Sequence, residues 1–259
     1  MEFPDKIRGI IQGGLTMTHS IQAIVEKQVL RWSLERQTAK TVYEKRHLPK
    51  PVITISRQVG SGASDIARAL ADELNCELLG IRIMDEVARQ SNIRKELLDT
   101  MDERIQSQIS DWIDKMFHNR KFVDSDIYHR HLLKIINYFM EMGNVVLLGR
   151  GAGFLPRIQP RLDVRIVAPM RHRKHRIMAT RNCSSDEAIT LINESDDRRT
   201  RFIRQVFGED WWDTRNYDLV INTENIDVAG AVSLIMLTWR DFANEHLVAG
   251  TYEATRACS

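Results

Sequence analysis

The 259-residue sequence is poor in the features that mark several classes of protein. Its three cysteines have no CxxC or CxxH spacing, which argues against a disulfide framework or a zinc site and favours a reducing compartment. The net charge is only +2, so a nucleic-acid or membrane partner would have to bind a local cluster of basic residues. No apolar signal core opens the chain, and the longest apolar stretch, around Val232 to Trp239, is too short to span a bilayer. We therefore expect a cytoplasmic protein that is not inserted in a membrane.

The first fifty residues differ from the rest of the chain. The composition overall, 43% hydrophobic and 28% charged, is that of a folded globular protein, and the length allows one large or two modest domains. Apolar residues at helical spacing predict an amphipathic helix within Met17 to Lys40, and the prolines of Leu48 to Pro51 predict an extended linker. We expect residues 1–50 to form a helical extension that packs on the main domain or mediates a homo-oligomer. A helix that binds a membrane surface or another partner is the alternative.

Short β-branched runs alternate with helical patterns from residue 51 onward. The runs cover Val52 to Ser56, Asn144 to Leu148, Val164 to Ala168 and Tyr217 to Asn222. The helical patterns cover Asp65 to Leu74, Arg94 to Asn119, Ile127 to Met142, Arg171 to Arg181, Ser185 to Phe207 and Ile226 to Glu245. This alternation predicts an α/β fold with βαβ crossovers and a mostly parallel sheet covered by helices on both faces. A ligand would bind beyond the carboxyl ends of the strands.

A glycine-rich loop, SRQVGSGASD at positions 56–65, joins the first strand to the first helix. Backbone N–H groups converge on an anion at such a place, so the loop predicts a phosphate cradle. Compared with the P-loop pattern GxxxxGK[ST], Gly62 matches the second glycine and Ser64 the hydroxyl that holds magnesium. Arg57 replaces the first glycine, and Ala63 replaces the lysine. The alternative is a simple glycine turn before an ordinary capped helix.

A second loop with glycines, LGRGAGF at positions 148–154, follows another buried strand. Glycine permits close approach of the backbone, and Arg150 could there bind a phosphate with two N–H groups. The alternative is a surface arginine in a tight turn.

Basic residues concentrate late in the main domain. Positioned cations stabilise the charge of a transferring phosphoryl group, although basic residues on helices also commonly form a solvated face. The stretch from Asp196 to Asp213, with Gly208 near a helix end, could form a mobile lid. The basic residues are Arg165, Arg171, Arg173, Lys174, Arg176, Arg181, Arg198, Arg199, Arg201 and Arg204.

Five ordered blocks resemble the cytidylate-kinase-like proteins, a branch of the P-loop nucleoside monophosphate kinases. The blocks are VITISRQVGSGASDIARALADEL, VVLLGRGAGFL, LDVRIVAPMRHRKHRIM, ESDDRR and YDLVINTENI, and the resemblance covers about residues 51–242. It implies a three-layer P-loop NTPase fold with a five-stranded, mostly parallel sheet over residues 51–246. It also implies a helical lid at about residues 184–214, which leaves residues 247–259 as a C-terminal tail.

The resemblance implies ATP with Mg²⁺ as cofactors and phosphoryl transfer to a nucleoside monophosphate, CMP or dCMP by the family's name. Arg150 matches the arginine of the Gly-Arg-Asp block that contacts the acceptor, and Gly151 stands where that block has aspartate. The implied catalytic residues are Arg57, in place of the missing lysine, with Arg150, Arg198, Arg199 and Arg201. The implied cofactor-binding residues are Gly60, Ser61, Gly62, Ala63, Ser64, Asp65, Arg176, Asn222 and Thr223, with Ser64 on the metal.

Other functions remain open at this point. Ala63 and Gly151 would also fit a non-catalytic nucleotide sensor or scaffold, which would bind nucleotide without turnover. A kinase for another small metabolite would keep the ATP site and change the acceptor. Binding of nucleic acid through the arginine-bearing helices is not expected, because the total charge is close to neutral.

Overall fold

The computed structural model describes residues 50–81, 84–85, 88, 103–117, 124–157 and 160–257. The expected N-terminal helix therefore lies outside the described residues. Of the helix expected at Arg94 to Asn119, residues 94–102 and 118–119 lie outside them as well. In chain order the elements are β1 (Val52–Arg57), α3 (Ala63–Glu73), β2 (Glu77–Leu79), α6 (Glu103–Phe117), α7 (Asp124–Met142), β3 (Val145–Leu148), the 3₁₀ turn η1 (Ala152–Phe154), β4 (Leu162–Val167), α8 (Met170–Arg181), α9 (Ser185–Phe207), the 3₁₀ turn η2 (Thr214–Asn216), β5 (Leu219–Asn222) and α10 (Val228–Ala257).

All strands pair in parallel, in the order β2-β3-β1-β4-β5, which confirms the expected five-stranded parallel sheet. β1 is central, and its residue Ile55 pairs with Leu148 of β3 and with Val164 of β4. The carboxyl ends of these three strands therefore open onto one edge. The alternation of β-branched runs did not identify β2, because its three residues at Glu77–Leu79 are too short to show a period.

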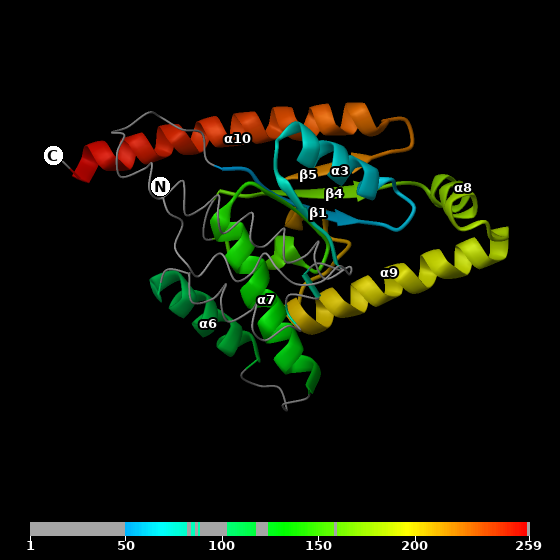
Figure 1. Cartoon of the computed structure of the whole chain (residues 1–259), viewed down its shortest axis with the longest axis horizontal. Coiled ribbons are helices and arrows are strands. Elements are labelled where there is room, and N and C mark those ends of the chain that lie inside the picture. The colour runs from blue at the N-terminus through cyan, green and yellow to red at the C-terminus, as the bar shows by residue number, and fades with distance from the viewer. Residues whose placement is uncertain are drawn as a thin grey trace, which may run out of the picture. The chain divides into compact units, whose positions relative to one another are not determined.

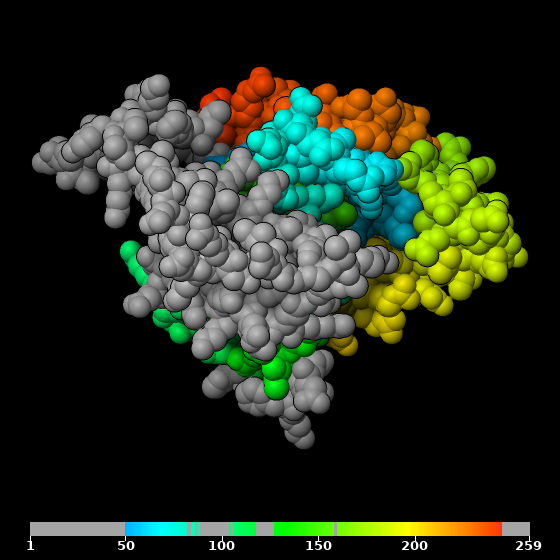
Figure 2. All heavy atoms as spheres, in the orientation of Figure 1, coloured from blue at the N-terminus to red at the C-terminus, as the bar shows by residue number. Residues whose placement is uncertain are grey.

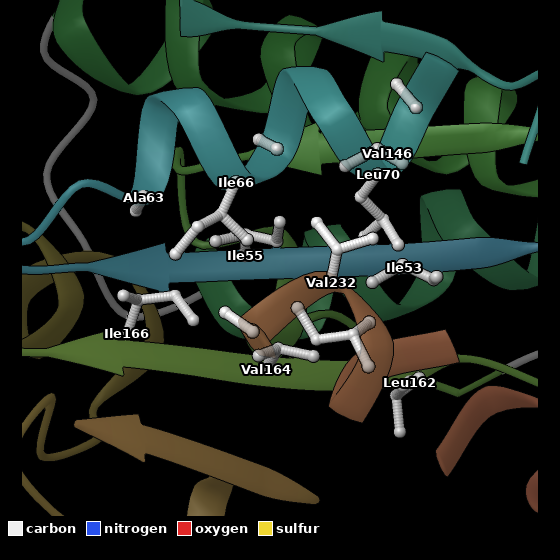
Figure 3. Close-up of a cluster of buried hydrophobic side chains, with 14 of the residues drawn as sticks. Ile53, Ile55, Ala63, Ile66, Leu70, Val146, Leu162, Val164, Ile166 and Val232 are labelled. Atoms are coloured by element: carbon white, nitrogen blue, oxygen red, sulfur yellow. The ribbon is translucent and has the colours of Figure 1, made fainter. Parts of the chain in front are cut away.

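Helices cover both faces of the sheet, which gives the expected three layers (Figure 1). α3 and α10 lie on one face, where Ile53 and Ile55 of β1 pack against Ile66, Leu70 and Val232 (Figure 3). α7 packs on β3, and α6 packs on α7. Burial of each such aliphatic side chain contributes about 1.5–3 kcal/mol. This core fixes the central strands and so fixes the loops at their carboxyl ends.

α9 is one continuous helix across the segment that the sequence analysis assigned to the lid. Ser184 caps its N-terminus by accepting from the N–H of Glu187, whose carboxylate in turn accepts from the N–H of Ser184. Gly208 ends it with φ +75°, as a left-handed C-cap. α8 and α9 form the right-hand edge of the molecule in Figure 2, next to α3. Mobility of the segment stays a prediction.

α10 is longer than the helix expected at Ile226 to Glu245. It continues to Ala257 and includes the residues that the sequence analysis assigned to a C-terminal tail. The physical reason is that residues 246–257 contain no proline and only one glycine, so nothing in them ends a helix. Within the described ranges, no helix combines the length and the apolar character that a bilayer crossing needs.

Candidate active site

The glycine-rich loop between β1 and α3 is held from three directions. Gly60 has φ +80°, and a Cβ atom there would lie 2.7 Å from the carbonyl oxygen of Arg173, so the position requires glycine. The Ser61 hydroxyl donates to the carbonyl of Gln58 at 2.8 Å. The Thr223 hydroxyl, at the end of β5, donates to the carbonyl of Ser61 at 2.8 Å. The loop is therefore built to keep one shape.

The N-terminus of α3 can hold a phosphate. Gly62 is its N-cap and supplies no side-chain hydrogen bond to the first N–H groups of the helix, which remain for a ligand. The guanidinium of Arg176 lies next to Gly62, with Cζ 3.4 Å from the position of a Cβ there, and forms an ion pair with Asp65. Ser64 is exposed in the first turn, whereas Ala63 is buried and brings no charge. Backbone N–H groups, one arginine and one hydroxyl fit the phosphates and the magnesium ion of a nucleotide.

A cavity of about 330 Å³ opens beside this loop, at the carboxyl ends of β1 and β3. The loop after β3, residues 149–154, forms one wall, and α9 forms another. Four of the predicted catalytic arginines reach it: Arg57, Arg150, Arg198 and Arg199. Four cations around a cavity of this size indicate an anionic ligand.

Arg57 is the cation that most needs an anion. Its guanidinium crosses to β3 and lies so close to Gly149 that a Cβ atom at Gly149 would overlap Nη1. Burial, followed by the charges of Arg199 and Arg150, lowers the pKa of Arg57 to about 9. Among the described residues the side chain of Arg57 has no hydrogen bond or ion pair, and so none to the Gly60 to Ser64 loop. It lines the cavity, which does not support the expectation that it replaces the missing P-loop lysine.

The other arginines of the cavity are partly neutralised. Arg150, with φ +56°, pairs with Asp85, which also accepts from the Tyr128 hydroxyl at 2.6 Å. Arg199 donates to the Ser195 hydroxyl at 2.6 Å, and burial lowers its pKa. The exposed Arg198 lies 3.4 Å from Glu194 on the same helix. The charge available to a ligand is therefore greatest at Arg57.

Aromatic side chains form the rest of the cavity wall. Phe154, Phe202, Trp211 and Tyr217 line it. The Trp211 indole donates to the Ser56 hydroxyl at 3.0 Å, which fixes the ring against β1. Behind the wall, Arg165 stacks on Trp211 at 4.3 Å from the ring centre and donates to the Tyr217 hydroxyl at 2.9 Å. Flat rings of this kind can pack against the base of a nucleotide.

A buried ionic cluster supports the loop after β3. Asp163 of β4 accepts from the Thr54 hydroxyl at 2.6 Å and pairs with Arg161 at 2.8 Å and with Arg157 at 2.9 Å. Arg161 in turn donates to the carbonyls of Gly153 and Leu155, both at 3.0 Å. The cluster thus fixes the backbone that forms the floor of the cavity.

The structure brings most of the predicted site residues into two adjacent groups. The first is the phosphate loop with Gly60, Ser61, Gly62, Ala63, Ser64, Asp65, Arg176 and Thr223, and the second is the cavity with Arg57, Arg150, Arg198 and Arg199. Arg201 does not line the cavity and donates to the carbonyl of Asp197 on its own helix at 3.4 Å. Asn222 is exposed at the end of β5 and accepts from the N–H of Glu224 at 3.1 Å.

Sequence reasoning did not identify the aromatic wall or the buried ionic residues. Trp211 and Tyr217 lie within or next to the predicted lid, and two aromatics in a polar segment are the signal that could have indicated a wall. Of the arginine group, Arg165 and Arg173 prove to be buried supports, and Arg171 pairs with Glu224 at the surface. Only part of this arginine group lies at the cavity or beside the glycine-rich loop.

The parallel sheet, the glycine loop at its central strand and the arginine-lined cavity define a P-loop protein of the nucleoside monophosphate kinase type. Sequence comparison identifies the family. The profile of the cytidylate kinase-like family matches residues 52–225, and the chain belongs to this family.

Its relatives include a cytidylate kinase of Saccharolobus islandicus, 28% identical over 186 residues that make up 71% of this chain and 88% of that protein. A cytidylate kinase of Methanocaldococcus jannaschii is 26% identical over 71% of this chain and 94% of its own length. Among solved structures, an uncharacterized protein of Eubacterium ventriosum has a TM-score of 0.60 at 21% identity, over 74% of this chain and 99% of that one. This last likeness supports the fold.

The space at Gly149 gives a first prediction. Gly149→Ala places a Cβ on Arg57 Nη1 at a backbone φ of +90°, so Arg57 must leave its position. Because small misplacements of a binding group are costly, we expect kcat/KM for the acceptor to fall about 10²-fold, with the KM for ATP unchanged. Steady-state kinetics with each substrate varied in turn measure both. Gly80→Ala is the matched control, since no atom of the described residues lies within 4 Å of a Cβ there. Equal losses in both variants would contradict the assignment.

Proposed function

We propose that the protein transfers the γ-phosphoryl group of ATP to a nucleoside monophosphate, with CMP or dCMP as the first candidates. The observation that carries this proposal is the Arg57 guanidinium, which has no partner among the described residues and lies with Arg150 and Arg199 in an aromatic-walled cavity next to a phosphate loop. The relatives named cytidylate kinase support the choice of acceptor. The cytoplasmic location remains a prediction.

On the donor side, ATP with Mg²⁺ supplies the phosphoryl group when bound. The N–H groups of the Gly60 to Ser64 loop and the start of α3 would hold the phosphates, with Arg176 beside them. The Ser64 hydroxyl would be a ligand of magnesium. Thr223 and Arg173 keep the loop in shape by bonding the carbonyls of Ser61 and Val59.

On the acceptor side, Arg57, Arg150 and Arg199 would bind the monophosphate and the aromatic wall would hold the base. An oxygen of the acceptor phosphate attacks the γ-phosphorus, and the bond to the β-phosphate oxygen breaks to release ADP. The acceptor is already an anionic nucleophile, so positioned cations are sufficient and no general base is needed. Arg57 is placed to stabilise the charge between the two phosphates.

A coupled assay of ADP release with AMP, CMP, dCMP, UMP and GMP tests this function. We expect turnover with at least one of them, and loss of that turnover in Arg150→Ala. Calorimetry that shows tight binding of ATP without turnover would favour a nucleotide sensor, which the Ala63 position supports. Turnover with a different phosphorylated metabolite alone would keep the kinase and change the acceptor.

Anions should stabilise the protein through Arg57. A ligand that pairs with this partly buried cation binds the folded state only, so phosphate or CMP at 100 times its Kd should add about 2.7 kcal/mol to the free energy of unfolding. For a chain of this size that is a rise in Tm of roughly 5–11 °C, measurable by calorimetry. The same ligand should raise the Tm of Arg57→Met much less. An equal rise in both proteins would place the anion elsewhere.

A further inference from the structure

One buried arginine connects the phosphate loop to the helix that carries the cavity arginines. Arg173 of α8 is 3% exposed. Its Nε donates to the carbonyl of Val59 in the loop at 2.8 Å, and its Nη2 donates to Asp196 Oδ2 of α9 at 2.7 Å. A single planar guanidinium thus bonds two segments that lie far apart in the sequence.

The second oxygen of the Asp196 carboxylate faces the acceptor cavity's arginine. Asp196 is 8% exposed, and its Oδ1 lies 3.6 Å from Nη1 of Arg199. This Oδ1 is buried and has no hydrogen bond. An oxygen in that state would gain from a small approach of Arg199, since a buried carboxylate oxygen without a hydrogen bond is costly. Asp196 therefore lies between the cation of the loop and a cation of the cavity.

The described charged groups around the Asp196 carboxylate come from α8 and α9. Arg173 and Arg199 are the described cations that pair with it, and they share its two oxygens. Its neighbour Asp197 is exposed and offers its backbone carbonyl to Arg201. Arg198 pairs instead with Glu194. One carboxylate thus pairs with an arginine that bonds the glycine-rich loop and with an arginine that lines the cavity.

We infer that Asp196 is a positioning residue that couples the donor and acceptor subsites. Phosphates that order the loop would fix Val59 and, through its carbonyl, Arg173. Arg173 in turn fixes Asp196, and Asp196 fixes the orientation of Arg199. The second ligand then loses less conformational entropy when it binds, so each ligand raises the affinity for the other. The identity of the ligands rests on the proposed function.

Calorimetric titrations of CMP with and without saturating β,γ-methylene-ATP and Mg²⁺ test this coupling, and the reverse titration must give the same factor. In the wild-type protein we expect the Kd of CMP to fall by about 5- to 150-fold when the ATP analogue is bound. Asp196→Asn keeps the shape and removes the charge that holds both arginines. Its coupling factor should fall close to one, whatever its affinity for each ligand alone.

Asp197→Asn is the matched control, because it removes an exposed carboxylate from the next position and should keep the wild-type factor. Arg173→Lys is the second variant: it keeps the charge but loses the planar fork whose Nε and Nη2 bond Val59 and Asp196, so it too should lose most of the coupling. If Asp196→Asn fails to fold, the coupling factor of Arg173→Lys tests the inference by itself.

The outcomes separate this inference from the proposed function. A wild-type protein that phosphorylates CMP with a coupling factor of one overturns the inference and leaves the function intact. Undiminished coupling in Asp196→Asn or in Arg173→Lys overturns it as well. A protein that neither binds nor phosphorylates a nucleoside monophosphate overturns both.

Discussion

Replacing Arg57 by methionine is expected to lower kcat/KM for the nucleoside monophosphate about 10³-fold, the loss typical of a cation removed from a phosphoryl-transfer site. The folded protein should not lose stability. The guanidinium has no partner among the described residues and lies near Arg150 and Arg199, so methionine replaces an unfavourable, partly buried charge with an apolar chain of similar length. Low activity with an unchanged or higher Tm would show that Arg57 contributes to ligand binding and not to stability.

The kinetics of Arg57→Met also decide which ligand Arg57 serves. The side chain lines the cavity and makes no hydrogen bond to the Gly60 to Ser64 loop, so we expect the KM for ATP to stay within about twofold of wild type, the change given by a lost surface interaction of a few tenths of a kcal/mol. A large rise in the KM for ATP would instead restore the view that Arg57 replaces the P-loop lysine.

Arg204→Met controls for the removal of a positive charge from this part of the protein, since Arg204 is exposed on α9 outside the cavity. It should keep wild-type kinetics. Full activity of Arg57→Met would remove Arg57 from the mechanism.

The fold could be predicted because its signals are local. The β-branched run at β1, the glycines after it and the helix pattern of α3 follow each other within 22 residues. Each can be recognised from its own local sequence. The ordered blocks then placed Arg150 and the lid segment. β2 was not predicted because a strand of three residues shows no period. The length of α10 was not predicted because the end of a helix is marked in the sequence only where glycine or proline stops it.

The site could be predicted only in part, because the direction of a side chain is set by packing across the fold. Arg57 is the last residue of β1, and only the closeness of β3 shows that its side chain extends over Gly149 and not into the glycine-rich loop. Arg173 and Arg176 lie three residues apart on α8, yet Arg173 is buried and donates to the carbonyl of Val59, while Arg176 lies beside Gly62 and pairs with Asp65. Spacing within one helix could not separate the two roles.

The buried cluster at Asp163 leads to the largest expected effect on stability. Asp163→Ala leaves Arg161, itself 2% exposed, with no carboxylate, and removes the acceptor of the Thr54 hydroxyl. Breaking a buried ion pair from one side costs about 3–5 kcal/mol, because a charge is left buried without its partner. For a chain of this size we expect Tm to fall by roughly 6–20 °C. Urea unfolding measures the loss of free energy directly.

The double variant Arg161→Met with Asp163→Ala separates the ion pair from the packing. If the uncompensated charge causes the loss, removing Arg161 as well should recover a large part of it, and the double-mutant cycle should give an interaction energy of at least about 0.5–3 kcal/mol. Strict additivity would mean that the volume of Asp163 matters and its charge does not. The cycle also bears on catalysis, because Arg161 bonds the carbonyl of Gly153, which lines the cavity, and the carbonyl of nearby Leu155. The double variant should therefore regain stability without regaining acceptor affinity, since the charge has gone and the floor is still released.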